Sequence, residues 1–269
     1  MKTIVHLSDL HFGRVNDAIV QPLLDAVHAL RPTVVAVSGD LTQRAKRREF
    51  KAAATFLAAL PRPQVVVPGN HDIPLYNLLN RFARPLNRYR RYITEDLLPF
   101  YHDEEIAICG VNTARSMTIK DGRISATQVR WIRAQFASVG SDVTKIVVTH
   151  HPFDIPAGHD HGDLVDRAEM AIKELAESGV DLFLAGHLHL THTGHTAARY
   201  KACGQSALVV QAGTAISTRG RGQLNSFNVI RIERSKIVLE GMEWNAESAT
   251  FAVGATEEFV LRSEGWAPA

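Results

Sequence analysis

The 269-residue sequence predicts a layered α/β fold, and three features of the chain support this prediction. Short β-rich runs alternate with helical patterns over the first two hundred residues, as expected when helices cover a sheet. From about residue 204 the chain continues in strand-like runs alone, which predicts a second sheet added to the first. The chain is also long enough to bury a substantial core, and 45% of its residues are hydrophobic.

The predicted strands are runs rich in β-branched and other apolar residues, bounded by turn residues. They cover 3–7, 33–38, 64–69, 105–111, 145–150, 182–186 and 207–213. Runs with period-two character follow at 226–233, 236–244 and 250–261. These last runs make up most of the strand-rich C-terminal part.

Five segments between the strands have helical periodicity: 17–30, 46–60, about 76–98, 126–138 and 163–178. The second ends before the prolines of 61–63, because proline cannot continue a helix. The fourth begins with a capping box formed by Ser125 and Gln128. The fifth ends at Gly179, a residue type suited to the left-handed position after a helix.

The chain contains no internal repeat, low-complexity tract or linker, so a single domain covering 1–269 is predicted. Its net charge of +2 does not favour a nucleic-acid partner. Cys109 and Cys203 fit no metal or redox spacing, and Cys109 is expected in the core. A strand pattern begins at once, and no apolar run approaches the roughly 20 residues of a membrane span. We therefore expect a cytoplasmic protein; a peripheral membrane contact and a homodimer stay open.

The segment 73–100 is rich in arginine and aromatic residues and has no acidic residue between Asp72 and Glu95. Its arginines are Arg81, Arg84, Arg88, Arg90 and Arg91. Two interpretations stay open. The segment is either a solvated amphipathic helix or a helical, cap-like element beside an anion-binding site.

Polar side chains follow five predicted strands, at the point where each strand ends. They stand in the stretches Ser8-Asp9-Leu10-His11, Gly39-Asp40, Gly69-Asn70-His71-Asp72, His150-His151 and Gly186-His187-Leu188-His189. Loops at the carboxyl ends of strands converge over one crevice in open α/β sheets. Burying so many carboxylates and imidazoles together is costly without a counter-charge. The sequence therefore predicts a metal cluster.

The candidate ligands offer oxygen and imidazole nitrogen but no thiolate. They are Asp9, His11, Asp40, Asn70, His150, His187 and His189. One tetrahedral ion cannot use all seven side chains, whereas two ions that share a carboxylate can. The ligand mixture suits two divalent ions of manganese, iron or zinc.

The ordered motifs D-x-H, GD, GNHD, H and GHxH span residues 9 to 189. This set resembles the calcineurin-like metallophosphoesterase superfamily. The stretches "DLHFG", "GDLTQ" and "HHPF", and the run from Gly122 to Trp131, look like its small bacterial cyclic-nucleotide and glycerophosphodiester phosphodiesterases. The resemblance implies a four-layer αββα sandwich of two mixed β-sheets flanked by helices.

The resemblance also implies roles for the site residues. Asp9, His11 and His189 would hold one metal. Asn70, His150 and His187 would hold the other, and Asp40 would bridge both. His71 would be the catalytic histidine that stabilises or protonates the leaving oxygen, with Asp40 the second residue assigned to catalysis. His151 is expected to be structural.

The expected reaction is hydrolysis of a small phosphodiester by in-line attack of a metal-bridging hydroxide. The stretches "GDLTQRA" and "GNHD" depart from the "GDxxDRG" and "GNHE" of the phosphoprotein phosphatases. UDP-diacylglucosamine pyrophosphatases have Arg at the position of His71, which disfavours their usual form. Such a pyrophosphatase and a DNA nuclease or repair phosphoesterase remain the alternatives.

Several further residues are candidates for the rim of the site. Arg81 and Arg84, and Arg219 and Arg221 of "STRGRG", are predicted phosphate contacts that compete with plain surface positions. His159, His161, His192 and His195 stay open between a place beside the site and simple exposure.

Overall fold

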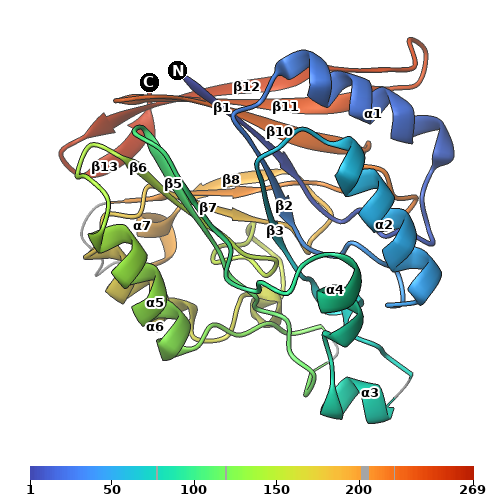
Figure 1. Cartoon of the computed structure of the whole chain (residues 1–269). Helices are drawn as coiled ribbons and strands as arrows, with labels where there is room; N and C mark the ends of the chain where they lie inside the picture. The colour runs from blue at the N-terminus through green and yellow to red at the C-terminus, as the bar shows by residue number, and fades with distance from the viewer. Residues whose placement is uncertain (77, 119, 201–205, 221) are drawn as a thin grey trace.

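The protein folds into two β-sheets that pack face to face (Figure 1). The computed structural model describes residues 1–76, 78–118, 120–200, 206–220 and 222–269. The first sheet has the order β13-β12-β11-β10-β1-β2-β3, and the second has the order β4-β5-β6-β7-β9-β8. Both sheets are mixed, because each combines a parallel centre with antiparallel strands.

The first sheet joins the start of the chain to its end. Its strands are β1 (Lys2–Leu7), β2 (Val34–Ser38), β3 (Gln64–Val67), β10 (Ser226–Glu233), β11 (Lys236–Asn245), β12 (Thr250–Arg262) and β13 (Gly265–Pro268). Strands β1, β2 and β3 are parallel, whereas β10 pairs antiparallel with β1. The strand-rich C-terminal part therefore extends the first sheet rather than forming a separate one.

The second sheet is built from the middle of the chain. Its strands are β4 (Phe100–His102), β5 (Ile106–Gly110), β6 (Thr144–Val148), β7 (Leu182–Ala185), β8 (His192–His195) and β9 (Leu208–Gln211). Strands β5, β6, β7 and β9 are parallel, and β4 and β8 form antiparallel edges.

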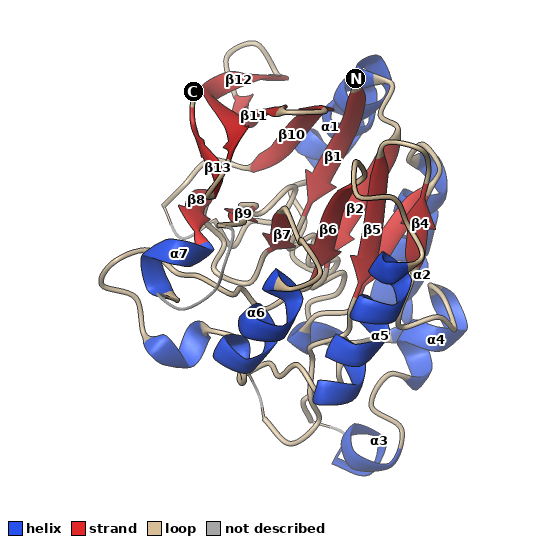
Figure 2. Ribbon diagram, turned by 90° about the vertical axis from the view of Figure 1, so that its left-hand side faces the viewer, coloured by secondary structure: helices blue, strands red, loops and turns tan. Residues whose placement is uncertain are grey.

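Helices cover the outer face of each sheet (Figures 1 and 2). Helices α1 (Asp17–Leu30) and α2 (Arg47–Ala59) pack on the first sheet, and α5 (Ala126–Ala137) and α6 (Ala168–Ala176) pack on the second. Successive side chains of a strand point to opposite faces of the sheet, so each strand contributes both to the core between the sheets and to the core under the helices. In β1, Ile4 points into the core between the sheets and Val5 points toward the helices. The predicted four-layer αββα sandwich is thus confirmed.

The ends of the main helices agree with their sequence signals. Helix α1 has the predicted bounds, and α5 begins with the predicted capping box between Ser125 and Gln128. Gly179 has a φ of +68° after α6. Helix α6 begins at Ala168 rather than 163, because Arg167 at its start has a left-handed backbone with a φ of +69°.

The Arg-rich segment differs from the continuous helical pattern predicted for 76–98. It contains two short helices, α3 (Leu78–Ala83) and α4 (Asn87–Tyr92), separated at Pro85. Proline lacks the amide hydrogen needed inside a helix and disfavours helical backbone in the residue before it. Helix α4 packs against α2, and α3 lies far from the chain termini (Figures 1 and 2).

Among the elements not expected from the sequence are the edge strands β4, β8 and β13 and the helix α7 (Thr196–Arg199). Each is short and lacks a clear periodic pattern. Cys109 is fully buried in β5, as predicted, whereas Cys203 lies outside the described residues. Within the described ranges, every helix is too short or too polar to cross a membrane.

Candidate metal centre

The predicted ligands converge at the carboxyl ends of five parallel strands. Asp9 and His11 follow β1, Asp40 follows β2, and Asn70 begins a short 3-10 helix (Asn70–Asp72) after β3. The other sheet contributes His150 after β6 and His187 and His189 after β7. The site therefore lies where loops from both sheets meet.

Five of these ligands have a left-handed backbone, which is uncommon for residues other than glycine. The φ angles are +53° at Asp9, +46° at His11, +50° at Asp40, +75° at His187 and +59° at His189. Such conformations cost about 1–3 kcal/mol each and persist where the surrounding structure imposes them. The tight turns point successive side chains of each loop toward one centre.

Asp9, His11 and His189 form the first group of converging atoms. The Nε2 atoms of His11 and His189 lie 3.1 Å apart. Asp9 Oδ1 lies 3.5 Å from His11 Nε2 and 3.3 Å from His189 Nε2. All three residues are buried, so their polar atoms face one another with little access to solvent.

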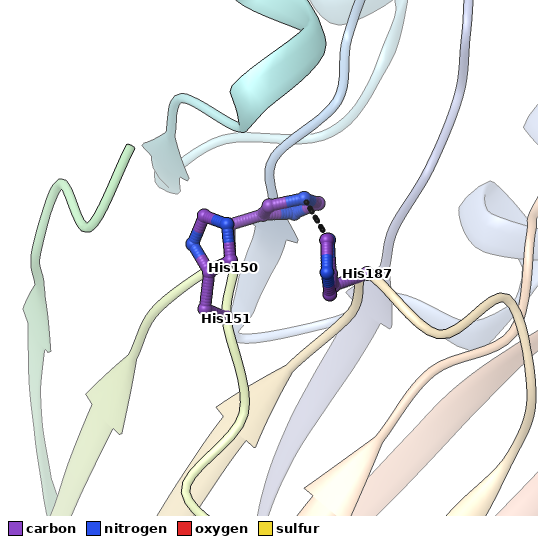
Figure 3. A group of neighbouring side chains, drawn as sticks. All are labelled: His150, His151 and His187. Atoms are coloured by element: carbon purple, nitrogen blue, oxygen red, sulfur yellow. Dashed lines mark hydrogen bonds between the residues drawn. The ribbon is translucent and has the colours of Figure 1, made fainter. Parts of the chain in front are cut away.

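Asn70, His150 and His187 form the second group. The Nε2 atom of His150 lies 3.0 Å from Asn70 Oδ1 and 3.3 Å from His187 Nδ1. The two rings are nearly perpendicular, at 81°, and the dashed line in Figure 3 marks the contact between these two nitrogens. This arrangement brings an amide oxygen and two imidazoles to one point.

Asp40 lies between the two groups. Its Oδ2 is 3.6 Å from His11 Nε2 in the first group, and its Oδ1 is 3.4 Å from His150 Nε2 in the second. Asp40 Oδ1 also accepts a hydrogen bond of 2.8 Å from the backbone N–H of His71. One carboxylate therefore faces both sets of donors.

Hydrogen bonds from Nδ1, on the side of the ring away from the centre, orient two of the histidines. His150 Nδ1 donates to the carbonyl oxygen of Ser38 at 2.8 Å, and His189 Nδ1 donates to that of Arg219 at 3.0 Å. With Nδ1 protonated, each ring presents the lone pair of Nε2 to the centre. Asp9 is held similarly, because its Oδ2 accepts from Ser8 Oγ and from the backbone N–H of His187.

The electrostatics of the groups fit metal binding. Burial tends to raise the pKa of Asp9, but the nearby His189 and His11 hold that pKa well below its ordinary value. Burial lowers the pKa of His11 and His187. Within the described part of the chain, Asp9 Oδ1 is buried and accepts no hydrogen bond. An ionised carboxylate, the neutral imidazoles of His11 and His187 and an unused buried oxygen suit a divalent cation. The pKa of His189 is instead raised, because its interactions with Asp9 outweigh the effect of burial.

His151 lies against the second group, but both of its ring nitrogens are used elsewhere. Its Nδ1 is 2.8 Å from the hydroxyl of Thr113, and its Nε2 donates to the carbonyl oxygen of Lys120 at 2.8 Å. Burial lowers the pKa of His151 to about 3, so the ring is neutral. Figure 3 shows this ring beside His150 and His187. Because both ring nitrogens already form hydrogen bonds, His151 has no nitrogen left for a metal, and it ties the loop after β6 to Thr113 and Lys120.

A buried carboxylate that the sequence analysis did not single out joins two of the ligand loops. Asp72 accepts hydrogen bonds from the backbone N–H groups of Leu41, Thr42 and Gly69, and from the hydroxyl of Thr42. Burial and the charge of Asp40 raise the pKa of Asp72 to about 7, while these hydrogen bonds act in the opposite direction. Asp72 thus fixes the loop of Asp40 against the loop of Asn70 and His71.

Replacing Thr42 with valine should loosen this connection. The hydroxyl of Thr42 contacts Asp72 Oδ1 at 2.9 Å and the backbone carbonyl of His71 at 3.2 Å. Leaving Asp72 short of a donor should cost about 1–3 kcal/mol of unfolding free energy and lower the turnover rate. Urea denaturation and steady-state kinetics would measure both. Thr55→Val is the matched control, since its exposed hydroxyl bonds only within α2; equal effects of the two variants would refute this role.

Gly69 leaves no room for a side chain beside Asp40. Its φ of −105° is open to any residue, but an added Cβ would overlap both the backbone nitrogen and Oδ1 of Asp40. Gly69→Ala should therefore displace the shared carboxylate and weaken metal affinity by about 10–100-fold. Equilibrium dialysis with Mn²⁺ would measure this. Gly140→Ala is the control, because its Cβ meets nothing closer than 3.8 Å; unchanged affinity in Gly69→Ala would contradict the prediction.

His71 is half-buried beside the two groups. Its Nδ1 donates to the carbonyl oxygen of Gln43 at 2.9 Å, and its Nε2 lies 3.0 Å from Nη1 of Arg219. The same Arg219 atom is 3.4 Å from His11 Nε2. The structure therefore brings His71 and Arg219 together at the edge of the centre.

The other candidate phosphate contacts differ in position. Arg81 is buried, and its guanidinium donates to the carbonyl oxygens of Pro74 and Thr118, so it holds two loops together. It also lines a depression that contains His71. Arg84 is exposed and lines a separate depression. Arg221 lies outside the described residues.

The remaining histidines do not join the centre. His192 and His195 are half-buried in strand β8; His192 Nε2 is 3.6 Å from Asp154 Oδ2, and the ring of His195 packs on Phe259. His192 and His195 are thus neither at the centre nor fully exposed, because β8 pairs with β9. His159 is half-buried and His161 is exposed.

Comparisons with known proteins agree with this geometry. The family model described as calcineurin-like phosphoesterase matches residues 2–190. A glycerophosphodiester phosphodiesterase, GpdQ, from Enterobacter lignolyticus is 26% identical over 71% of this chain and 72% of its own length. A probable cyclic nucleotide phosphodiesterase from Rhodococcus erythropolis is 28% identical over 87% of this chain and 81% of its own.

Solved structures share the fold at low identity. A purple acid phosphatase from yellow lupin superposes with a TM-score of 0.71 at 14% identity; the match covers 96% of this chain and about half, 53%, of that protein. A dimetal phosphatase from Danio rerio superposes with a TM-score of 0.64 at 16% identity, over 89% of this chain and 95% of its own. With the family model spanning more than half of its residues and all five ligand loops, this chain belongs to the calcineurin-like phosphoesterase family.

Proposed function

We propose that the protein is a binuclear-metal phosphodiesterase that hydrolyses a small phosphodiester. The observation that carries the proposal is the position of Asp40, whose two carboxylate oxygens face two separate groups of donors. Asp9, His11 and His189 would hold one divalent ion, and Asn70, His150 and His187 would hold the other. Manganese, iron and zinc all suit these ligands.

The bound ions would supply a hydroxide nucleophile near neutral pH and neutralise the charge of the phosphate. The protein's own contribution is to position the groups around the phosphate. Arg219 reaches the edge of the centre with its guanidinium and would bind a non-bridging phosphate oxygen. His71, held through Nδ1 by Gln43, presents Nε2 toward the same space. In its doubly protonated form, with Arg219 turned to the phosphate, His71 would give the Nε2 proton to the leaving oxygen.

The relatives support a diester as substrate. Proteins named for glycerophosphodiester and cyclic-nucleotide hydrolysis align with this chain over about 70–90% of its length, at 24–28% identity. Such identity supports the reaction class more strongly than any particular substrate. A small diester of either kind is therefore the proposed substrate class.

A substrate panel with added Mn²⁺ tests the proposal. It contains bis(p-nitrophenyl) phosphate, p-nitrophenyl phosphate, cyclic AMP, glycerophosphodiesters, UDP-diacylglucosamine and single-stranded DNA. We expect kcat/KM to be highest for a small diester. Preference for the monoester would overturn the proposal. Preference for the sugar nucleotide would identify a pyrophosphatase, and strongly salt-dependent DNA cleavage would identify a nuclease.

A further inference from the structure

Four arginines surround a depression between the start of α2 and helix α4, which we name the arginine pocket. They are Arg47, Arg84, Arg88 and Arg91. Arg47 is the first residue of α2, and the other three come from the segment around α4. Their convergence depends on the packing of α4 against α2, since the two helices are far apart in the sequence.

Among the described residues, no carboxylate pairs with the arginines of the arginine pocket. The segment 73–94 contains no acidic residue. Glu49 of α2 is buried, and its Oε2 accepts hydrogen bonds from the backbone N–H groups of Arg44 and Lys46. Four guanidinium groups without a counter-ion repel one another unless an anion binds between them.

Loops beside the candidate metal centre contribute to the arginine pocket. A second depression is lined by Asn70 and His71 of the centre, together with Gln43 and Arg44. The two linings share no residue, but Arg47 and Pro74 of the arginine pocket follow closely on Arg44 and Ile73 of the second depression in the chain. Arg88 of the arginine pocket also contacts this loop, because its Nη1 donates to the carbonyl oxygen of Ala45 at 2.6 Å.

We propose that the arginine pocket binds an additional phosphate group carried by the leaving alcohol of the substrate. This inference rests on the proposed function, in which His71 marks the side from which the leaving oxygen departs. Guanidinium groups bind phosphate through paired, charge-assisted hydrogen bonds, which suits a terminal phosphate. Tyr76 is 79% exposed, and the guanidinium of Arg44, which lines the second depression, lies 5.8 Å from the centre of its ring. An aromatic base on the leaving group could stack there.

The substrate class is thus a phosphodiester whose leaving group is itself a phosphate monoester, such as a nucleotide. Water adds its hydroxyl to the phosphorus, the bond from phosphorus to the leaving oxygen breaks, and that oxygen takes a proton. The product released past His71 is the phosphorylated alcohol. No oxidant or other co-reactant is needed.

Three dinucleotides test the inference with Mn²⁺ present: ApA, its 5′-phosphorylated form pApA, and its 3′-phosphorylated form ApAp. Product analysis shows which nucleoside leaves. We expect kcat/KM to be at least about tenfold higher when the extra phosphate is on the leaving nucleoside than for ApA. Equal rates for all three, with bis(p-nitrophenyl) phosphate hydrolysed normally, would overturn the inference and leave the proposed function intact. Failure to hydrolyse any diester would instead overturn the proposed function.

The double variant Arg84→Gln/Arg91→Gln links the preference to the arginine pocket. Its ratio of kcat/KM for the preferred dinucleotide over ApA should fall toward one. The control Arg130→Gln/Arg262→Gln removes the same charge at exposed positions elsewhere and should keep the ratio. Titration calorimetry with AMP gives a second measurement that does not depend on turnover. AMP should bind the double variant about tenfold more weakly than the wild type, and equal affinities would count against the pocket.

Discussion

Replacement of Asp40 with alanine is expected to remove bound metal and catalytic activity together. The carboxylate of Asp40 faces both groups of ligands, with Oδ2 toward His11 and Oδ1 toward His150. Without it, two cations would sit among imidazoles and one remaining carboxylate, Asp9, and would repel each other with less compensation. The loss of several kcal/mol of stabilisation corresponds to a fall in kcat/KM of about 10³-fold or more.

Metal analysis of the purified variant and kinetics on bis(p-nitrophenyl) phosphate would measure both effects. Asp25→Ala serves as the matched control, since its exposed carboxylate interacts only with Gln21 on α1. Circular dichroism would establish that the Asp40 variant is folded. A folded Asp40→Ala protein with two bound metals and undiminished turnover would contradict the bridging role.

Replacement of His71 with alanine is expected to spare the metals and slow the reaction. The ring of His71 is not part of either group of converging ligand atoms, and its Nδ1 is already used by the carbonyl oxygen of Gln43. Its other ring nitrogen, Nε2, lies 3.0 Å from Nη1 of Arg219 at the edge of the centre. Loss of a general acid lowers the rate by about 10²–10⁴-fold. The effect should be largest for alkoxide leaving groups and small for p-nitrophenolate, which needs no proton.

Comparison of kcat for a glycerophosphodiester and for bis(p-nitrophenyl) phosphate distinguishes this role from a structural one. A structural defect would lower both rates alike, and it would also alter metal content. His102→Ala is the control, because His102 is exposed in the edge strand β4. A His71→Ala enzyme that retains its metals and hydrolyses both substrates at the wild-type rate would refute the assignment.

Much of the fold follows from local patterns in the chain. The parallel strands and the long helices have strong periodicity and clear boundary residues, so their positions agree with prediction to within a few residues. The continuous helical pattern in segment 73–100 was mispredicted, and the edge strands β4, β8 and β13 were missed. The segment is interrupted by Pro85, whereas β4 and β8 are short and form only because a neighbouring strand supplies their hydrogen-bond partners.

The residues that meet at the candidate site could also be predicted from local patterns in the chain. Each ligand directly follows a strand, and parallel strands bring their carboxyl ends to a common edge regardless of the details of packing. This is why Asp9, Asp40, Asn70, His150 and His187 come together as expected. Their individual roles as ligands remain predictions that the metal measurements above address.

Sequence alone therefore determined the layered α/β fold, the family and the set of residues at the strand ends, because residue type and local periodicity encode these features. Tertiary structure decided which groups support or extend the centre. Asp72 joins two loops, His151 uses both nitrogens on Thr113 and Lys120, and Arg219 comes within hydrogen-bond distance of His71 from 148 residues away. Such contacts depend on how separate loops pack, and no local pattern in the chain records those distances. The arginine pocket belongs to the same class, because only the packing of α4 against α2 brings its four charges together.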